Sequence, residues 1–451
     1  MTWPVPTPRL ALVAVAAALA VFVAPDQGRS SIAGLGIDNR FLAVNALLLL
    51  VAAVDGALAP PPGSIGVERR HPRSITLGQV APLTWVVEGS AGRRRWGSSR
   101  RVWLADELAP SLRAPARRVG LDLPRRGTAS ATVDLRPRRR GRFEPTELVL
   151  RTIGPAGLVY KQRRRHLPST LKVLPPFRSA REAELSLRRA RILEVGLRSA
   201  RGRGGGTEFD SLRELTPDDE TRRIDWAATA RSQRPIVRTF RAERNQTVLC
   251  LIDAGRTMAG RVDGVPRLEF AVDGAMLLAE LATGLGDRMG LVAFDQDVTA
   301  TIEPSNRRSQ RAVIGEQLFD LEPALAETSF ERAVTHVLSR YRRRSFLVLM
   351  TELGAEPVEE FLLPALPLLV RTHLVVVAAV RDPALVEWTT STTVDEDGGF
   401  LRASALAALD RREAVAAQLR GRGVVVVDVE PDRFASALGD AYLDAKAVGR
   451  L

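Results

Sequence analysis

Acidic and hydroxyl side chains follow apolar, strand-like runs in the second half of the chain. Asp253 and Thr257 come after one run, Thr328 lies in a later loop, and Glu352 comes after another run. If these runs are parallel strands of one sheet, their carboxyl ends meet at one edge and bring the side chains together. Carboxylate and hydroxyl oxygens from three loops suit a hard divalent ion such as Mg²⁺. The pattern predicts a candidate metal site, and a strand-end role for Asp253, capping the next loop, is the alternative.

Other catalytic signatures are missing from the sequence. The single cysteine, Cys250, lies in an apolar run typical of a small core residue, and it forms neither an internal disulfide nor a cysteine metal cluster. The four histidines lack metal-ligand spacing, and no Gly-x-Ser-x-Gly motif occurs. The stretch Gly202–Gly206 lacks the Gly-Lys-Ser/Thr ending of a phosphate loop. We expect a protein that is not an enzyme; a metal-dependent hydrolase is the alternative, but it would need a general base that the sequence does not offer.

The elements that would position these residues begin at Thr247. Six apolar runs predict strands, at residues 248–252, 289–294, 298–302, 346–350, 374–380 and 424–429. Helical patterns separate most of them, at residues 268–285, 330–341, 357–370, 404–419 and 432–446, with Ser404 as a predicted N-cap. Strands that alternate with helices predict an α/β fold with a doubly wound, mostly parallel sheet over residues 247–451.

A connector at residues 179–246 precedes this sheet. It begins with a helical pattern at residues 179–199 and continues with a dense set of opposite charges around one tryptophan. The residues of this set are Asp218, Asp219, Arg222, Arg223, Asp225, Trp226 and Arg231. One interpretation is a salt-bridged segment that docks onto the sheet domain with Trp226 buried as its anchor. The other is a recognition surface for a charged partner, in which arginine forks pair with carboxylates.

Residues 61–178 carry a β-rich pattern and many arginines. Short alternating runs punctuated by Gly, Pro and Asp predict a small antiparallel β-sandwich. Two arginine clusters, Arg93 to Arg95 and Arg138 to Arg140, fall in its predicted turns, where we expect solvated loop faces. Contact with anionic lipid is the alternative for these clusters. The chain carries a formal net charge of +13, but no recognisable nucleic-acid-binding fold accompanies it, so we expect no nucleic-acid partner.

Two apolar runs open the chain, at residues 10–24 and 41–54. Each is short against the roughly 20 residues of a spanning helix, but flanking residues can extend it. A cleaved signal peptide is the competing interpretation of the first run. The second run follows after a short polar turn, so residues 1–60 are predicted to form a transmembrane hairpin. Basic residues after the second run predict that both ends of the hairpin and the soluble domains are cytoplasmic.

The C-terminal pattern resembles the von Willebrand A fold with its metal-ion-dependent adhesion site. The resemblance implies that Asp253 matches the first aspartate, Thr257 a hydroxyl ligand, and Thr328 the threonine of the second loop. Glu352 stands at the final aspartate position, and Gly255 stands where a ligating serine is usual. The resemblance therefore implies a degenerate site that holds Mg²⁺ weakly or not at all.

The connector and its neighbours are similar to the bacterial family called domain of unknown function 58. Residues 218–231, Gly286 to Phe294 and Arg139 to Phe143 carry this similarity, with Pro217 where glycine is usual. Such proteins often accompany MoxR-type AAA+ ATPases. The resemblance implies a membrane-anchored adaptor or assembly factor that binds such an ATPase. A structural protein of the cell envelope that contacts anionic lipid is the alternative.

Overall fold

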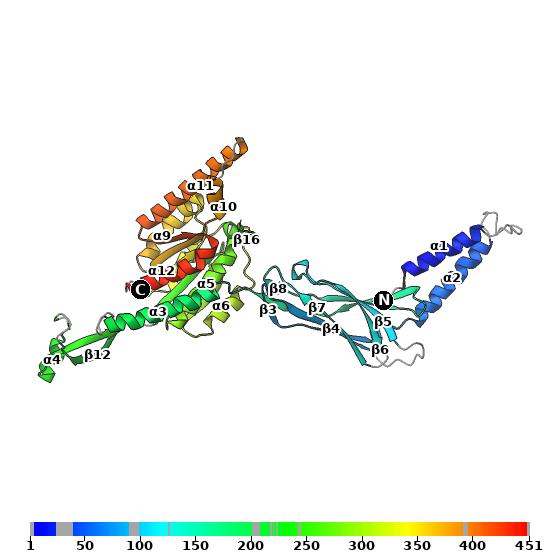
Figure 1. The fold of residues 1–451 in the computed structure, drawn as a ribbon, viewed down its shortest axis with the longest axis horizontal. Helices are drawn as coiled ribbons and strands as arrows, with labels where there is room; N and C mark the ends of the chain where they lie inside the picture. The colour runs from blue at the N-terminus through cyan, green and yellow to red at the C-terminus, as the bar shows by residue number, and fades with distance from the viewer. Residues whose placement is uncertain are drawn as a thin grey trace. The chain divides into compact units, whose positions relative to one another are not determined.

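The computed structural model describes residues 4–23, 39–89, 99–124, 127–200, 208–216, 219, 221, 224–241, 245–390 and 396–448. The chain divides into two compact units, Met1–Leu174 and Pro175–Leu451 (Figure 1). It is a mixed α/β protein with several sheets.

The first unit begins with two apolar helices that contact each other, α1 (Pro8–Val23) and α2 (Asn39–Leu58). Large hydrophobic side chains stay exposed along both, and Phe22 is 87% exposed. Only the segment Arg40–Ser64 is long and apolar enough to cross a membrane among the described residues; Pro8–Val23 is shorter. The predicted pair of spans thus contains one helix of sufficient length.

The residues that flank this helix pair are built into the β-rich part of the unit. Strand β1 (Pro4–Pro6), before α1, pairs antiparallel with β10 (Val159–His166). Near the end of α2, the buried Asp55 carboxylate accepts backbone N–H bonds from Ala156 (2.7 Å), Leu158 (2.8 Å) and Val159 (3.0 Å). The turn between β9 and β10 therefore holds both ends of the helix pair.

Two antiparallel sheets share one hydrophobic core in this unit. The five-stranded sheet has the order β1-β10-β9-β5-β6 and the three-stranded sheet the order β2-β4-β7. Strands β3, β11 and β8 form a smaller third sheet. The bounds are β2 (Ile65–Arg70), β3 (Ser74–Thr76), β4 (Ala81–Gly89), β5 (Ser99–Asp106), β6 (Arg118–Pro124), β7 (Gly127–Leu135), β8 (Gly141–Phe143), β9 (Glu147–Ile153) and β11 (Leu171–Leu174).

The arginine clusters of the predicted turns differ from expectation in one place. Arg138 and Arg139 are exposed, as expected for a solvated loop, but Arg140 is only 3% exposed. Arg93 to Arg95 lie outside the described residues. Inside the core, Asp106 accepts hydrogen bonds from Arg69 (2.5 Å) and from the Trp85 indole (2.5 Å), so this buried carboxylate is paired.

The second unit is built on a six-stranded sheet with the order β18-β17-β14-β19-β20-β21. All neighbours are parallel except β18, which is antiparallel to β17 at one edge. The strands match the six predicted runs, and the four central ones, β17, β14, β19 and β20, are apolar stretches buried on both faces. Their bounds are β14 (Thr247–Asp253), β17 (Arg288–Phe294), β18 (Val298–Ser305), β19 (Phe346–Met350), β20 (Leu374–Val380) and β21 (Val425–Val429).

Helices cover both faces of this sheet and form two hydrophobic cores with it. One core contains residues of α3 (Ala180–Ala200), α5 (Arg267–Gly284), α6 (Gln310–Leu318) and α12 (Pro431–Ala447). The other contains residues of α7 (Phe330–Arg340), α9 (Leu363–Val370) and α11 (Glu396–Gly421). The predicted N-cap at Ser404 is wrong, because α11 begins at Glu396 and Ser404 lies inside it. Helix α10 (Pro383–Thr390), which packs against α11, was not predicted.

The predicted charged connector is an arm made of a strand, a helix and a strand. Strands β12 (Glu208–Glu214) and β13 (Ile236–Arg241) pair antiparallel, and helix α4 (Trp226–Ser232) lies between them in sequence. The two strands form a sheet of their own. Figure 1 shows the arm projecting from its unit, with α4 at the tip.

Candidate functional site

The carboxyl edge of the six-stranded sheet brings together two of the predicted site residues, Asp253 and Thr328. Asp253 ends β14 and is 1% exposed. Its Oδ1 accepts hydrogen bonds from the Thr328 hydroxyl (2.6 Å) and the Gly255 amide (2.7 Å), and its Oδ2 accepts one from the Thr351 hydroxyl (2.6 Å). Burial raises the pKa of Asp253 above its usual value, and nearby Asp295 adds to the rise. The three hydrogen bonds oppose this shift but do not cancel it. The carboxyl group is thus satisfied by its own loops.

Thr257 and Gly255 complete the loop after β14. Thr257 lies in a short helix, η4 (Arg256–Ala259), and is not among the hydrogen-bond donors to Asp253 in the described part of the chain. A Cβ added to Gly255 would overlap with the Thr328 hydroxyl oxygen and lie 3.1 Å from Asp253 Oδ1. Glycine is therefore needed at this position because the threonine hydroxyl fills the space of a side chain.

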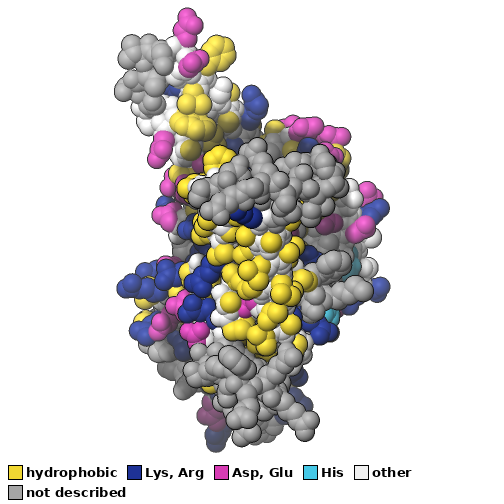
Figure 2. Space-filling model, turned by 90° about the vertical axis from the view of Figure 1, so that its right-hand side faces the viewer, with side chains coloured by type: hydrophobic (Ala, Val, Ile, Leu, Met, Phe, Trp, Pro, Cys, Tyr) yellow, Lys and Arg dark blue, Asp and Glu magenta, His cyan; other side chains and the backbone are white. Residues whose placement is uncertain are grey.

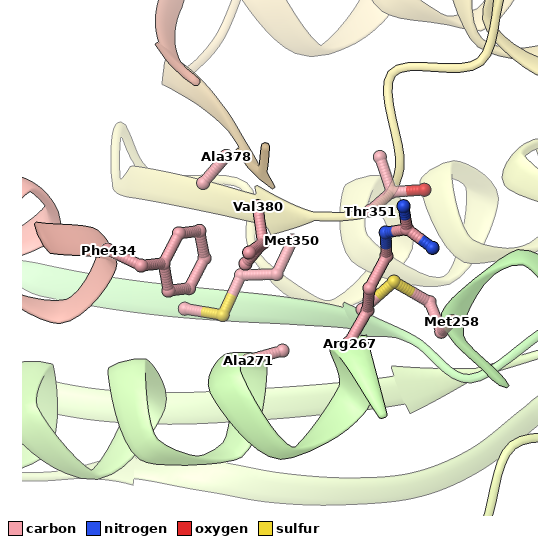
Figure 3. A pocket seen from close by; sticks show the side chains of 8 residues that line it. All are labelled: Met258, Arg267, Ala271, Met350, Thr351, Ala378, Val380 and Phe434. Atoms are coloured by element: carbon pink, nitrogen blue, oxygen red, sulfur yellow. The ribbon is translucent and has the colours of Figure 1, made fainter. Parts of the chain in front are cut away.

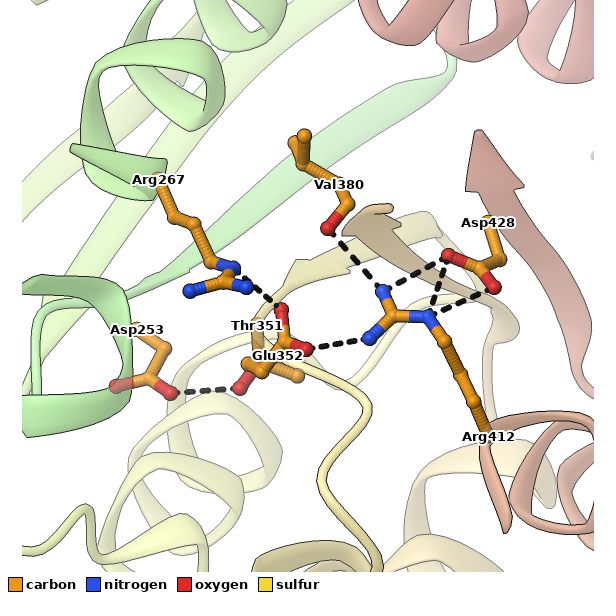
Figure 4. A network of polar contacts seen from close by, with 7 residues as sticks. All are labelled: Asp253, Arg267, Thr351, Glu352, Val380, Arg412 and Asp428. Atoms are coloured by element: carbon orange, nitrogen blue, oxygen red, sulfur yellow. Dashed lines mark hydrogen bonds and ion pairs between the residues drawn. The ribbon is translucent and has the colours of Figure 1, made fainter. Parts of the chain in front are cut away.

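Glu352 is held by arginines at the same edge (Figure 4). Arg412, from α11, donates to Glu352 Oε1 and also to Asp428 on β21, with Nη2 2.8 Å from Oδ1. Arg267, at the start of α5, places Nε 2.8 Å from Glu352 Oε2, an ion pair without hydrogen-bond alignment. Burial lowers the pKa of Arg412, but the carboxylates of Asp428 and Glu352 outweigh it and raise the pKa, so the guanidinium stays charged.

A cavity of about 10 Å³ lies beside this network (Figure 3). Apolar side chains, among them Met258, Met350 and Phe434, line most of it, and Arg267 and Thr351 add polar groups. This volume is roughly that of one water molecule. The cavity is too small for a substrate.

The residues at this edge do not fit Mg²⁺. The ion would need several oxygens free to coordinate it, whereas Asp253 already accepts three hydrogen bonds and Glu352 is paired with two guanidinium groups. The position of the missing serine is filled by Thr328. Among the described residues, no group of three or more His, Cys, Asp or Glu side chains is placed to hold a metal.

The arm carries the described part of the predicted signature set, and two of its carboxylates are bonded to groups within the arm. Arg213 binds Asp219 through both terminal nitrogens, at 2.5 and 2.7 Å, and Thr216 donates to the same carboxylate. The Arg213 guanidinium, followed by the Thr216 donors, holds the pKa of Asp219 well below its usual range. The sequence did not predict the ion pair of Arg213 with Asp219, because Arg213 was not in the signature set.

A second carboxylate organises helix α4. Asp225 is its N-cap and accepts from the Ala228 amide (2.9 Å), while Arg238 of β13 donates to its other oxygen (2.7 Å). The Ala228 bond and then Arg238 lower the pKa of Asp225. Arg231 is exposed and donates to the Ala227 carbonyl. Asp218, Arg222 and Arg223 lie outside the described residues.

Trp226 lies at the first position of α4 and is 71% exposed. The prediction that it is buried as an anchor on the sheet domain is therefore wrong. The arm instead buries Ala228 and Val237 as a small core of its own. The indole is thus exposed at the start of a helix whose N-cap, Asp225, is bonded to Arg238.

The sequence did not identify Arg267 or Arg412 as determinants of this edge. Thr351 precedes Glu352, and its alternation with Met350 could have indicated that it faces Asp253. Arg412 lies sixty residues from Glu352. Its alanine-rich surroundings in the sequence are the one signal that could have found it, since a charged residue on such a helix face needs a partner.

Comparison with known proteins gives a family without an assigned function. Residues 211–392 match the family model described as protein of unknown function DUF58. An uncharacterized protein of Mycobacterium tuberculosis (strain ATCC 25618 / H37Rv), Rv1480, is 27% identical over 246 residues, covering 51% of this chain and 76% of the relative. An uncharacterized protein of Mycobacterium bovis, Mb1516, matches to the same extent.

Two solved structures resemble part of the chain. The conserved hypothetical protein BatB from Bacteroides thetaiotaomicron has 16% identity and a TM-score of 0.32, covering 44% of this chain and 99% of that protein. An aerotolerance-related membrane protein from Bacteroides fragilis NCTC 9343 has 17% identity, the same TM-score and the same coverage. Likeness at this level supports no conclusion about function.

Proposed function

We propose that this chain is a membrane-anchored protein-binding module, an adaptor or assembly factor that works with a MoxR-type AAA+ ATPase. The observation that carries the proposal is the exposed Trp226 at the tip of a self-contained arm. Tryptophan is among the residues that contribute most to protein–protein binding. Because Asp219 and Asp225 already fix the arm, binding need not order it, which lowers the entropic cost of association.

The sheet domain is proposed to be of the von Willebrand A type. Its strand order, with the first strand β14 at the centre and one antiparallel edge strand, supports this assignment. The proposal includes no enzyme activity and no metal. In support, Asp253 and Glu352 are bonded to protein groups, and the neighbouring cavity has room for about one water molecule.

The membrane anchor is proposed to be a hairpin of two spans with both ends in the cytoplasm. Strand β1 supports retention of α1, because residues before α1 and residues after α2 belong to the same β-rich unit. Both ends of the hairpin then lie on one side of the membrane. The basic residues that follow α2 favour the cytoplasmic side.

The test is a pull-down of the full chain from native membranes, with Trp226→Ala and a matched control, Phe400→Ala. Phe400, on α11, is 79% exposed, so both changes remove an exposed aromatic group from the same unit. We expect an AAA+ ATPase with the wild type and with the control. With Trp226→Ala we expect its recovery to fall by about tenfold or more, the loss of a binding hot spot. Added chelator should change nothing.

If Trp226→Ala recovered as much ATPase as the wild type, the arm would not be part of the binding surface. The absence of any ATPase from the wild-type sample would refute the adaptor proposal. Loss of the partner in chelator would contradict the conclusion that the sheet edge works without metal.

A further inference from the structure

The positive charge of the protein is concentrated in the β-rich part of the first unit. Residues 61–174 contain 24 Lys and Arg against 8 Asp and Glu, a net charge of +16. Because the whole chain carries +13, the remaining residues together carry −3. The net charge is therefore concentrated in residues 61–174 and is not spread over the molecule.

The sheets are fixed to the end of the apolar helix pair by described contacts. Asp55 of α2 binds the amides of Ala156, Leu158 and Val159, β1 pairs with β10, and the Thr7 hydroxyl donates to the Gly157 carbonyl (2.8 Å). The β9–β10 turn cannot move away from the helices without breaking these bonds. Figure 2 looks onto this side of the molecule: hydrophobic side chains fill the middle of the view, and Lys and Arg side chains gather beside them.

The outer face of the five-stranded sheet presents cationic and aromatic side chains close to this turn. Arg151 of β9 is exposed, lies with Cζ 5.9 Å from the centre of the Tyr160 ring, and donates to Gln162 (2.7 Å). Trp103 of β5 is directly opposite Arg151 in the register and is 40% exposed. Its indole lies against Gly120, where a Cβ would be 3.2 Å from the ring. Arginine, tyrosine and tryptophan are the side chains enriched where proteins meet lipid headgroups.

Distance decides which charges can reach the headgroups. Gln162, the register partner of Arg151, is three residues beyond Val159, or about 10 Å along the strand. This is about one Debye length at physiological salt. Arg136 follows β7, whose Gly127 pairs with Gly89 at the helix end of the unit. Arg136 lies nine residues beyond Gly127 along the strand, or about 30 Å from the helix end of the unit, so salt screens its charge from the headgroups.

We propose that the outer face of β5, β9 and β10 binds anionic phospholipid headgroups of the membrane in which the helix pair is anchored. Arg151 supplies the charge, and Trp103 and Tyr160 supply amphipathic rings at headgroup depth. The partner is a lipid surface, so this contact is separate from the arm and does not depend on the proposed ATPase.

The test uses the full chain in nanodiscs of pure phosphatidylcholine or of equal parts phosphatidylcholine and phosphatidylglycerol. A nitroxide on Ile153→Cys, half-buried and opposite Tyr160, reports on the face. The native Cys250 is fully buried and does not compete for the label. We expect the label to be shielded from a water-soluble nickel complex in phosphatidylglycerol discs only, and we expect added salt to reverse the shielding.

Arg151→Glu and Arg136→Glu are matched variants with the same change of charge. Each charge near an anionic surface contributes about a fivefold preference, so reversal at Arg151 should lower the lipid-bound fraction of this face by about 30-fold. Arg136→Glu should leave the shielding intact. Equal label exposure in both lipids, or equal effects of the two variants, would overturn the proposal. Shielding in phosphatidylcholine discs by added DNA or heparin, without anionic lipid, would also overturn it by assigning the face to a soluble polyanion.

Discussion

Gly255→Ser would restore a hydroxyl at the position where a metal-ion-dependent adhesion site has a ligating serine. We expect it to destabilise the sheet domain instead of creating a Mg²⁺ site. The new Cβ would overlap with the Thr328 hydroxyl and lie 3.2 Å from the Ala326 carbonyl oxygen. The Thr328 hydroxyl must then move, and the buried Asp253 loses a 2.6 Å hydrogen bond.

The magnitude follows from these contacts. A hydrogen bond to a charged group contributes about 1.5–3 kcal/mol, and crowding a packed site costs about 1–3 kcal/mol. The serine hydroxyl can donate to Asp253 and recover part of the loss, so we expect a net destabilisation of about 2 kcal/mol. In a unit of this size, 1 kcal/mol corresponds to about 2–4 °C, so the unfolding midpoint should fall by about 4–8 °C.

The assay is thermal unfolding of the purified full chain with Mg²⁺ and with chelator, for Gly255→Ser, Thr328→Ala and the double variant. Thr328→Ala removes the obstacle, so Gly255→Ser should cost less in that background, and the two effects should not add. The reasoning would be refuted if Mg²⁺, but not chelator, raised the midpoint of Gly255→Ser. A restored serine would then bind metal without conflict with Thr328.

Three further predictions concern buried polar groups. Arg412→Met leaves two carboxylates, of Glu352 and Asp428, without their shared partner, and should lower the free energy of unfolding by about 3–5 kcal/mol in chemical denaturation; a loss below 1 kcal/mol would show that the network is not structural. His373 is 2% exposed, neither of its ring nitrogens is hydrogen-bonded, and burial lowers its pKa from 6.5. Because the unfolded chain then binds more protons than the folded chain below about pH 6.5, the free energy of unfolding falls as the solution becomes more acidic. His373→Leu should flatten this pH dependence between about pH 7 and pH 5 and should change the free energy of unfolding by zero to about 1 kcal/mol in the stabilising direction. Chemical denaturation at several pH values measures both effects. An unchanged slope would mean that other groups cause the pH dependence. Asp55→Ala should speed amide hydrogen exchange in the β9–β10 turn by about tenfold or more per lost bond, measured by mass spectrometry, and unchanged protection would mean that other contacts fix the turn.

The strands of the second unit could be predicted because their signal is local. The four central strands are continuous apolar runs buried on both faces, and their parallel direction follows from alternation with helices. Asp253 and Thr328 could be placed at one edge for the same reason. Their meeting depends only on where strands end, which the apolar runs mark directly.

Helix boundaries on the surface were less predictable. Helix α11 begins at Glu396, eight residues before the predicted N-cap Ser404. Its first turns expose Phe400 and Leu401, so no amphipathic pattern marks them. A serine inside a helix resembles a cap whenever the apolar periodicity begins after it.

Partners far apart in sequence were not predictable. Glu352 stands where a metal ligand was expected, and only the fold shows that Arg267 and Arg412 approach it. One interpretation of the sequence had Trp226 buried as the anchor of a docked connector, whereas its side chain is exposed. The charge pattern also did not indicate which residues pair near Trp226, namely Arg213 with Asp219 and Arg238 with Asp225.

The pairing of β1 with β10 has a consequence for biosynthesis. Pro4, Val5 and Pro6 pair with Lys161, Tyr160 and Val159, so the first strand of the chain completes its sheet only after more than 150 further residues have left the ribosome. At about 5–20 residues per second, this delay is on the order of ten to thirty seconds. During that time α1 and α2 have been synthesised, whereas β10 and the turn that holds their ends have not. The helix pair is therefore complete before the sheet that holds its two ends, and the β-rich unit forms as a later step.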